Sequence, residues 1–179
     1  MNQFESIIKT LLEAEGYWVR SSLKINVSKL DKVKIGKHSI PRPEIDLLAY
    51  RPNSNKLIAM EVKSFLDSPG VRLSKLLESH EVPEGQYKLL TCENYRDIVV
   101  AQLKEDLITY GMALSDTTIQ IGLAAGNVYG KDEPAIRELF NKKGWLFWGP
   151  TEIREKLKIL SDSGYSNDTA TMVSKILLR

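Results

Sequence analysis

The chain has 179 residues, of which 42% are hydrophobic and 27% are charged, and its formal net charge is +2. This length and apolar content are typical of one globular domain with a single core. No stretch approaches the roughly 18 apolar residues that a membrane span needs, and residues 1–5 lack the basic and apolar regions of an export signal. The single cysteine, Cys92, excludes an intramolecular disulfide and fits a reducing cytoplasm. One cysteine and two histidines also argue against a Cys/His zinc site.

The first predicted element is a helix over residues 2–15. Its apolar residues at positions 4, 7, 8, 11 and 12 form one stripe, and Gly16 ends it. Glu5 lies at the flank of this stripe, so its side chain can point along the packing edge towards a sheet. The alternative is an ordinary first-turn glutamate that complements the helix dipole.

A strand is predicted over residues 17–27, within a strongly basic segment. Residues 20–42 hold seven basic residues against one acidic residue, a net +6 that leaves −4 for the rest of the chain. Apolar residues alternate at positions 23, 25 and 27 and again at 33 and 35, which predicts a strand or a hairpin arm. Such a segment suits a polyanion, with Lys24, Lys32 and Lys34 as candidate phosphate contacts. A solvated charged face is an equally good explanation.

A β-hairpin is predicted next. Two extended apolar runs, residues 45–50 and 57–65, flank a turn sequence of Pro, Asn, Ser and Asn at residues 52–55. Because side chains alternate along a strand, Glu61 and Lys63 leave the second run on one face, roughly 7 Å apart.

Asp46 lies on the first run of this hairpin, on the face shared by Glu44, Leu48 and Tyr50 in a regular strand. A register that places Asp46 beside Glu61 brings two carboxylates and the Lys63 ammonium to one patch. Two like charges ~4 Å apart repel by about 4 kcal/mol at an effective dielectric of 20, so this pair needs a cation. Carboxylate oxygens suit a hard cation such as Mg²⁺.

Helices and strands alternate through the remaining sequence. The predicted elements are a helix at 71–79, a helix at 95–113 capped by Thr91 or Asn94, a strand at 118–124, a helix from Asp132 to Gly144, a strand at 145–148, and two closing helices that begin at Thr151 and at Ser166 or Asn167. This order predicts an α/β fold with a central mixed sheet flanked by helices. We expect one domain, residues 1–179, with a core at 1–150 and a small helical extension at 151–179. The aromatic cluster at 145–148 is expected in the core.

Asp46, the sequence Glu61-Val62-Lys63 and the helical Glu5 together resemble the PD-(D/E)xK superfamily, the restriction-endonuclease-like nucleases. The element order is similar to that of Holliday-junction resolvases and Mrr-type restriction enzymes, where a helical Glu precedes an I-D strand and an E-x-K strand. Where those families have P-D, this chain has Pro43 and then Asp46 after two residues. The resemblance is close over about residues 1–66.

The resemblance implies a restriction-endonuclease-like core and a catalytic site at Asp46, Glu61 and Lys63. Asp46 and Glu61 would hold Mg²⁺ or Mn²⁺, with the carbonyl of Val62 as a further ligand. Lys63 would orient or deprotonate the attacking water, or neutralise developing charge. Glu5 would support the metal directly or through water, with Glu15 as a competing candidate.

The implied activity is metal-dependent hydrolysis of phosphodiester bonds, expected in DNA, by an endodeoxyribonuclease of a restriction, repair or junction-resolving kind. Cleavage of both strands usually requires two active sites, which a homodimer would supply. No residue of the sequence indicates a homodimer. One alternative is a non-catalytic subunit of the same fold that binds nucleic acid or a partner. Another is a small α/β interaction protein in which Glu61 and Lys63 form a surface ion pair.

Overall fold

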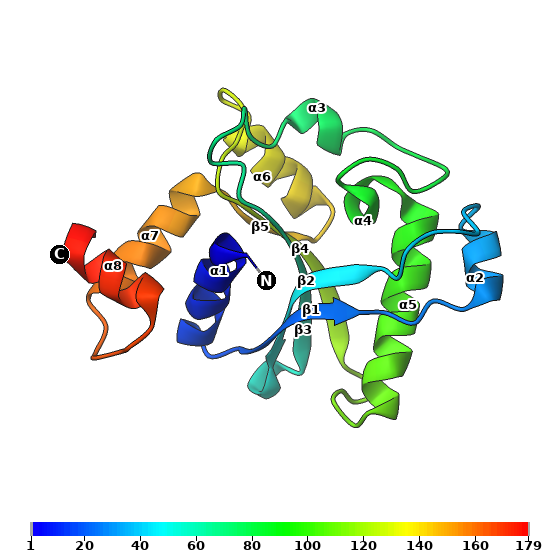
Figure 1. Cartoon of the computed structure of the whole chain (residues 1–179), viewed down its shortest axis with the longest axis horizontal. Helices are drawn as coiled ribbons and strands as arrows, with labels where there is room; N and C mark the ends of the chain where they lie inside the picture. The colour runs from blue at the N-terminus through cyan, green and yellow to red at the C-terminus, as the bar shows by residue number, and fades with distance from the viewer. Residues whose placement is uncertain (1, 179) are drawn as a thin grey trace.

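The computed structural model describes residues 2–178, which form a five-stranded mixed β-sheet flanked by helices (Figure 1). The strands are β1 (Trp18–Lys24), β2 (Glu44–Arg51), β3 (Lys56–Lys63), β4 (Thr118–Ala125) and β5 (Leu146–Trp148). They lie in sequence order across the sheet. The first three are antiparallel, whereas β4 runs parallel to β3 and β5 parallel to β4. The expected α/β fold with a mixed sheet is therefore confirmed.

Two hydrophobic clusters lie on the two faces of this sheet. The helices on one side are α3 (Leu73–Leu76), α4 (Lys88–Thr91), α5 (Glu93–Thr109) and α6 (Glu133–Lys142). Those on the other side are α1 (Gln3–Ala14), α7 (Pro150–Ser161) and α8 (Thr169–Leu178). Figure 1 shows α1, α7 and α8 grouped to the left of the sheet and α5 to its right. Among residues 2–178, no helix has both the length and the apolar character that crossing a membrane would require.

The first helix and the hairpin form as their sequences predict. Asn2 caps α1, and Glu5 completes a capping box, so two N-terminal N–H groups of this helix are satisfied by side chains. The turn between β2 and β3 begins with a short 3₁₀ helix, η1 (Pro52–Ser54), and closes on Asn55 in the left-handed conformation at φ 47°. Asparagine tolerates this conformation better than most residues, which explains the turn.

The prediction of an extended strand or hairpin arm across the basic segment is wrong in its second half. β1 ends at Lys24, and residues 29–34 form a short helix, α2 (Lys29–Lys34). Ser28 caps this helix by accepting a hydrogen bond from the Asp31 N–H at 3.1 Å, and Lys34 bonds Asp31 one turn later at 2.8 Å. Local capping and an i,i+3 ion pair outweigh the apolar alternation at 33 and 35.

Several boundaries also differ from their predictions. The helix expected at 71–79 has only four residues, and α4 was not predicted. The long helix is preceded by Cys92, and α7 by Gly149, rather than by the expected caps. Asp168 caps the last helix by accepting the N–H groups of Ala170 and Thr171. Phe147 and Trp148 are buried and Trp145 packs against the core, as expected of that aromatic cluster.

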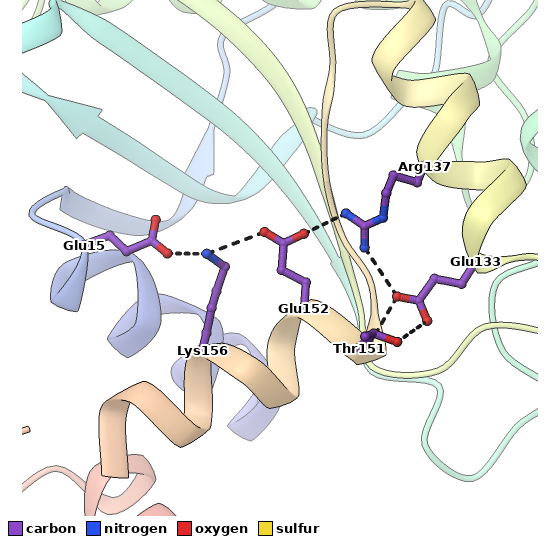
Figure 2. Close-up of polar contacts among 6 residues, drawn as sticks. All are labelled: Glu15, Glu133, Arg137, Thr151, Glu152 and Lys156. Atoms are coloured by element: carbon purple, nitrogen blue, oxygen red, sulfur yellow. Dashed lines mark hydrogen bonds and ion pairs between the residues drawn. The ribbon is translucent and has the colours of Figure 1, made fainter. Parts of the chain in front are cut away.

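A chain of alternating charges connects α1, α6 and α7 (Figure 2). Lys156 of α7 bonds Glu15 at the end of α1 and lies 3.5 Å from Glu152. Glu152 in turn accepts from Arg137 of α6 at 2.9 Å. Glu133 continues the chain, because it pairs with Arg137 and accepts from the N–H and the hydroxyl of Thr151. This network fixes α7 between its two neighbouring helices.

Replacing Lys156 with methionine should lower the free energy of unfolding by about 1–2 kcal/mol, because Glu15 loses its cation and Glu152 keeps only Arg137. The change also removes the ammonium that lies 4.3 Å from the centre of the Trp148 ring. Urea denaturation measures the effect. Lys158→Met is the matched control, since Lys158 is on the same helix, is exposed and forms no side-chain ion pair with residues 2–178. Equal destabilisation by both changes would show that the network does not stabilise the fold.

Candidate active site

The candidate site begins where regular pairing between β2 and β3 stops. The last pair on this side is Leu47 with Met60, and the next step of the same register sets Asp46 opposite Glu61. At this step the N–H of Val62 donates to the Oδ2 atom of Asp46 at 2.7 Å, in place of a main-chain carbonyl of β2. The N–H and C=O of one strand residue point to the same side, so the Val62 carbonyl also faces β2. Asp46 therefore lies against the main chain of the strand that carries Glu61 and Lys63.

The backbone departs from a regular sheet on both sides of Asp46. Ile45 packs in the same cluster as Leu48, while Leu47 packs in the other cluster, so the expected alternation along β2 is interrupted here. On β1, Ser22 lies between the residues that pair with Ile45 and Leu47, and its φ is 54°. A positive φ is uncommon for serine, and such strained residues are often found at functional sites.

Glu61 and Lys63 lie on one face of β3, as predicted, and contact each other. The Lys63 ammonium donates to Oε1 of Glu61 at 2.5 Å, and the side chains of Lys63 and Glu61 are 20% and 16% exposed, respectively. Both line a pocket of about 380 Å³ between the sheet and α5. The pair is therefore largely shielded from solvent, which strengthens its electrostatic interactions relative to those of an exposed pair.

Burial and like charge both act on the ionisable groups of this site. The pKa of Asp46 is raised from its ordinary value of 3.8 to about 6. Burial is the largest cause and the charge of Glu61 the second, while the Val62 N–H and Lys63 lower this pKa. Burial, followed by the charge of Glu61, also raises the pKa values of Tyr87 and Tyr95 to about 12. The single ammonium of Lys63 therefore does not offset the effect of burial and of two carboxylates. A cation bound to the carboxylates would offset this effect.

Glu5 is in the first turn of α1, which packs on the opposite face of the sheet from α5, and it is close enough to Asp46 for its charge to act on that carboxyl. Its carboxylate accepts hydrogen bonds from the main chain and the side chain of Asn2, at 3.0 and 2.7 Å. Its charge contributes to the raised pKa of Asp46, although it is the weakest of the contributing groups. Glu15 is engaged at the other end of α1 by Lys156 and has no such effect on Asp46. Of the two candidates for supporting the metal, Glu5 is therefore the better placed.

The three candidate phosphate contacts do not lie on one arm. Lys24 is exposed at the end of β1, whereas Lys32 and Lys34 belong to α2, and Lys34 is paired with Asp31. The backbone carbonyl of Lys34 accepts from the side chain of Asn94 at 2.8 Å, which holds α2 beside α5. The basic segment thus lies beside α5 and does not extend the hairpin.

The available ligands for a metal are two carboxylates, from Asp46 and Glu61, and the carbonyl of Val62. No group of three or more His, Cys, Asp and Glu side chains within residues 2–178 is arranged to hold a metal ion. Mg²⁺ commonly binds through one or two carboxylates and keeps several waters, with substrate phosphates completing its shell. These all-oxygen ligands therefore fit Mg²⁺ or Mn²⁺, and they do not fit zinc or copper, which prefer nitrogen and sulfur.

Replacing Asp46 with asparagine should stabilise the metal-free protein at pH 8 by about 1–3 kcal/mol. The folded protein holds the Asp46 proton more tightly than the unfolded chain does. Protonation of Asp46 therefore stabilises the wild-type fold at low pH, and this contribution is lost as pH rises from about 4 to about 6. Asparagine keeps an acceptor for the Val62 N–H and carries no charge. Urea denaturation in EDTA at pH 4 and pH 8 measures the difference, which should shrink at the lower pH. A variant less stable than the wild type at pH 8 would contradict the interpretation that the Asp46 carboxylate destabilises the fold.

Comparison of the chain with models of known protein families, with curated proteins and with solved structures finds no match. The likeness to PD-(D/E)xK nucleases accordingly rests on the site residues and on the order of the elements.

Proposed function

We propose that this protein is a metal-dependent nuclease of the restriction-endonuclease-like fold that hydrolyses phosphodiester bonds, with DNA as the expected substrate. The observation that carries the proposal is the position of Asp46 against the main chain of β3, beside the Glu61–Lys63 pair that lines the pocket, where burial and like charge hold the pKa of Asp46 near 6. A bound cation would stabilise two carboxylates kept in such surroundings, and the adjacent lysine supplies a group for phosphate chemistry.

The order of the elements supports the same proposal. A helix that carries Glu5 precedes three antiparallel strands, and Asp46 and Glu61 lie on the second and third of these. A long helix, α5, then leads to a strand parallel to β3. This is the order that the resemblance to resolvases and Mrr-type enzymes implies, with Asp46 and the Glu61-Val62-Lys63 sequence on neighbouring strands.

Each residue has a separate role in the proposed reaction. Asp46, Glu61 and the Val62 carbonyl would bind Mg²⁺, which when bound polarises a phosphate and lowers the pKa of a coordinated water. The Lys63 ammonium would hold the attacking water or the non-bridging phosphate oxygen, exchanging its present bond with Glu61 for the substrate. Glu5 would act through a water, since its carboxylate also caps α1.

A second candidate is a non-catalytic subunit of the same fold that binds nucleic acid or a partner. The Glu61–Lys63 ion pair favours it, because a 2.5 Å contact already satisfies part of the Glu61 carboxylate without any metal. The two candidates differ in turnover, not in fold. Mg²⁺-dependent cleavage of DNA by the purified protein decides between them.

Lys63→Ala should reduce turnover about 10²-fold or more while changing Mg²⁺ affinity little, because Lys63 is not a metal ligand. Asp46→Asn and Glu61→Gln should instead lower Mg²⁺ affinity and turnover together. Cleavage of labelled DNA and calorimetric Mg²⁺ titration provide the two measurements. Lys56→Ala, at the opposite end of β3, is the matched control and should retain activity. Undiminished cleavage by purified Lys63→Ala protein would assign the activity to another site or to a contaminant.

Neutralising Lys24, Lys32 and Lys34 together should weaken DNA binding and flatten its salt dependence, by roughly 0.9 for each duplex phosphate that the protein no longer neutralises. Lys34 should contribute least, since Asp31 already pairs with its ammonium. Affinity measured by fluorescence anisotropy across a salt series gives the slope. A slope identical to that of the wild type would restrict the role of these lysines to solubility.

A further inference from the structure

The candidate site lies on the wall of a pocket, not on a flat face. The pocket of about 380 Å³ has Glu61 and Lys63 of β3 on one wall. Residues 85–89 and the first turns of α5 form the wall opposite, so the site is approached between two walls. Pockets of this volume are at the lower end of the range for small-molecule ligands. One nucleotide fits such a space, whereas the width of a base-paired duplex does not.

The lining of this pocket combines polar and apolar residues. Its polar and charged lining residues are Glu44, Glu61, Lys63, Gln86 and Lys88, and the side chains of Gln86 and Lys88 bond no residue within 2–178. Phe65, Leu89 and Tyr95 provide apolar and aromatic surface. A nucleotide has the same combination, since its phosphate is anionic, its base has two apolar faces, and the edge of that base carries hydrogen-bonding groups.

Phe65 lies two residues after the end of β3 and is held in an unfavourable backbone conformation. Its φ is 45°, which is rare for a bulky residue, and its carbonyl accepts from the N–H and the hydroxyl of Ser68, both at 3.2 Å. The loop therefore maintains an aromatic side chain, only partly buried, in the lining of the pocket and two residues from Lys63. Strain retained at such a position is consistent with a role in binding.

A second pocket, of about 520 Å³, adjoins the first and shares Phe65, Gly85 and Gln86 with it. Arg72 and Lys75 line this second pocket. Its acidic residues are already paired, since Glu78 contacts Lys75 at 2.6 Å and Glu84 contacts His80 at 3.0 Å. The two pockets are neighbours on either side of these shared residues, so they could hold successive nucleotides of one strand.

We propose that the pocket beside Glu61 and Lys63 binds one unpaired nucleotide, with its base against Phe65 and its edge at Gln86, so that the substrate is single-stranded DNA or a duplex with an unpaired nucleotide at the cleavage point. In an intact duplex the base is stacked and paired, and bringing it into a side pocket costs a few kcal/mol of unstacking. An unpaired nucleotide avoids most of this cost. The inference rests on the proposed nuclease function but is tested separately from it.

The test compares three labelled DNAs of one sequence: a single strand, a fully paired hairpin, and the hairpin with one unpaired nucleotide. Affinity is measured by fluorescence anisotropy in Ca²⁺, which also binds carboxylate sites, and cleavage is measured in Mg²⁺. We expect the single strand and the interrupted hairpin to bind about tenfold or more tightly than the paired hairpin. Equal affinity for all three would overturn the proposal.

Phe65→Gly removes the ring and suits the positive φ, so it should fold and should abolish most of this preference. Gln86→Ala, at an exposed position, should weaken binding of the single strand several-fold and leave the paired hairpin unaffected. Leu66→Ala is the matched control, since Leu66 is 64% exposed and does not line the pocket. Equal loss of affinity for all three DNAs in Phe65→Gly would overturn the proposal. Absence of Mg²⁺-dependent cleavage with the preference intact would overturn the nuclease function and support the pocket.

Discussion

The hydrogen bond from the Val62 N–H to Asp46 is the interaction on which the candidate site depends. It replaces the next main-chain bond of the β2–β3 ladder and so ends the regular hairpin at this point. Without it, the Asp46 carboxylate would lose its contact with β3, and the main-chain N–H of Val62 would lack its partner. The bond stabilises the charged form of Asp46, yet burial and the charge of Glu61 outweigh it, and the pKa of that carboxyl stays near 6.

This balance means that the fold holds a destabilising group in place. The surrounding sheet supplies the stability that the site does not, because β3 is paired on both sides and its apolar residues are buried in two clusters. The strained residues Ser22 and Phe65 lie next to the same end of the sheet. Charge repulsion and backbone strain that are retained on a rigid scaffold are common features of functional sites.

The last two helices, α7 and α8, help to position α1, the helix that carries Glu5. α1 packs on the sheet together with α7 and α8, which come last in the sequence. Lys156 joins α7 to the end of α1, and Glu133 and Arg137 join α7 to α6. The closing helices are therefore part of the structural support of the site, although none of their residues lies in it.

The sequence by itself determined the hairpin, the first helix and the shared face of Glu61 and Lys63. These follow from local rules: apolar periodicity, a capping box, and a Pro-Asn turn between two extended apolar runs. Local rules also explain the main error, since the cap at Ser28 converts part of an alternating segment into the helix α2.

Only the tertiary structure decided where Asp46 lies and what surrounds it. The interruption of alternation at Ile45 and the positive φ of Ser22 arise from pairing with neighbouring strands, which no local pattern encodes. The pocket likewise depends on residues 85–89 and α5 being brought against β3 from distant parts of the chain. Burial, and with it the raised pKa of Asp46, is a property of that assembly, because desolvation depends on every element packed around the carboxylate.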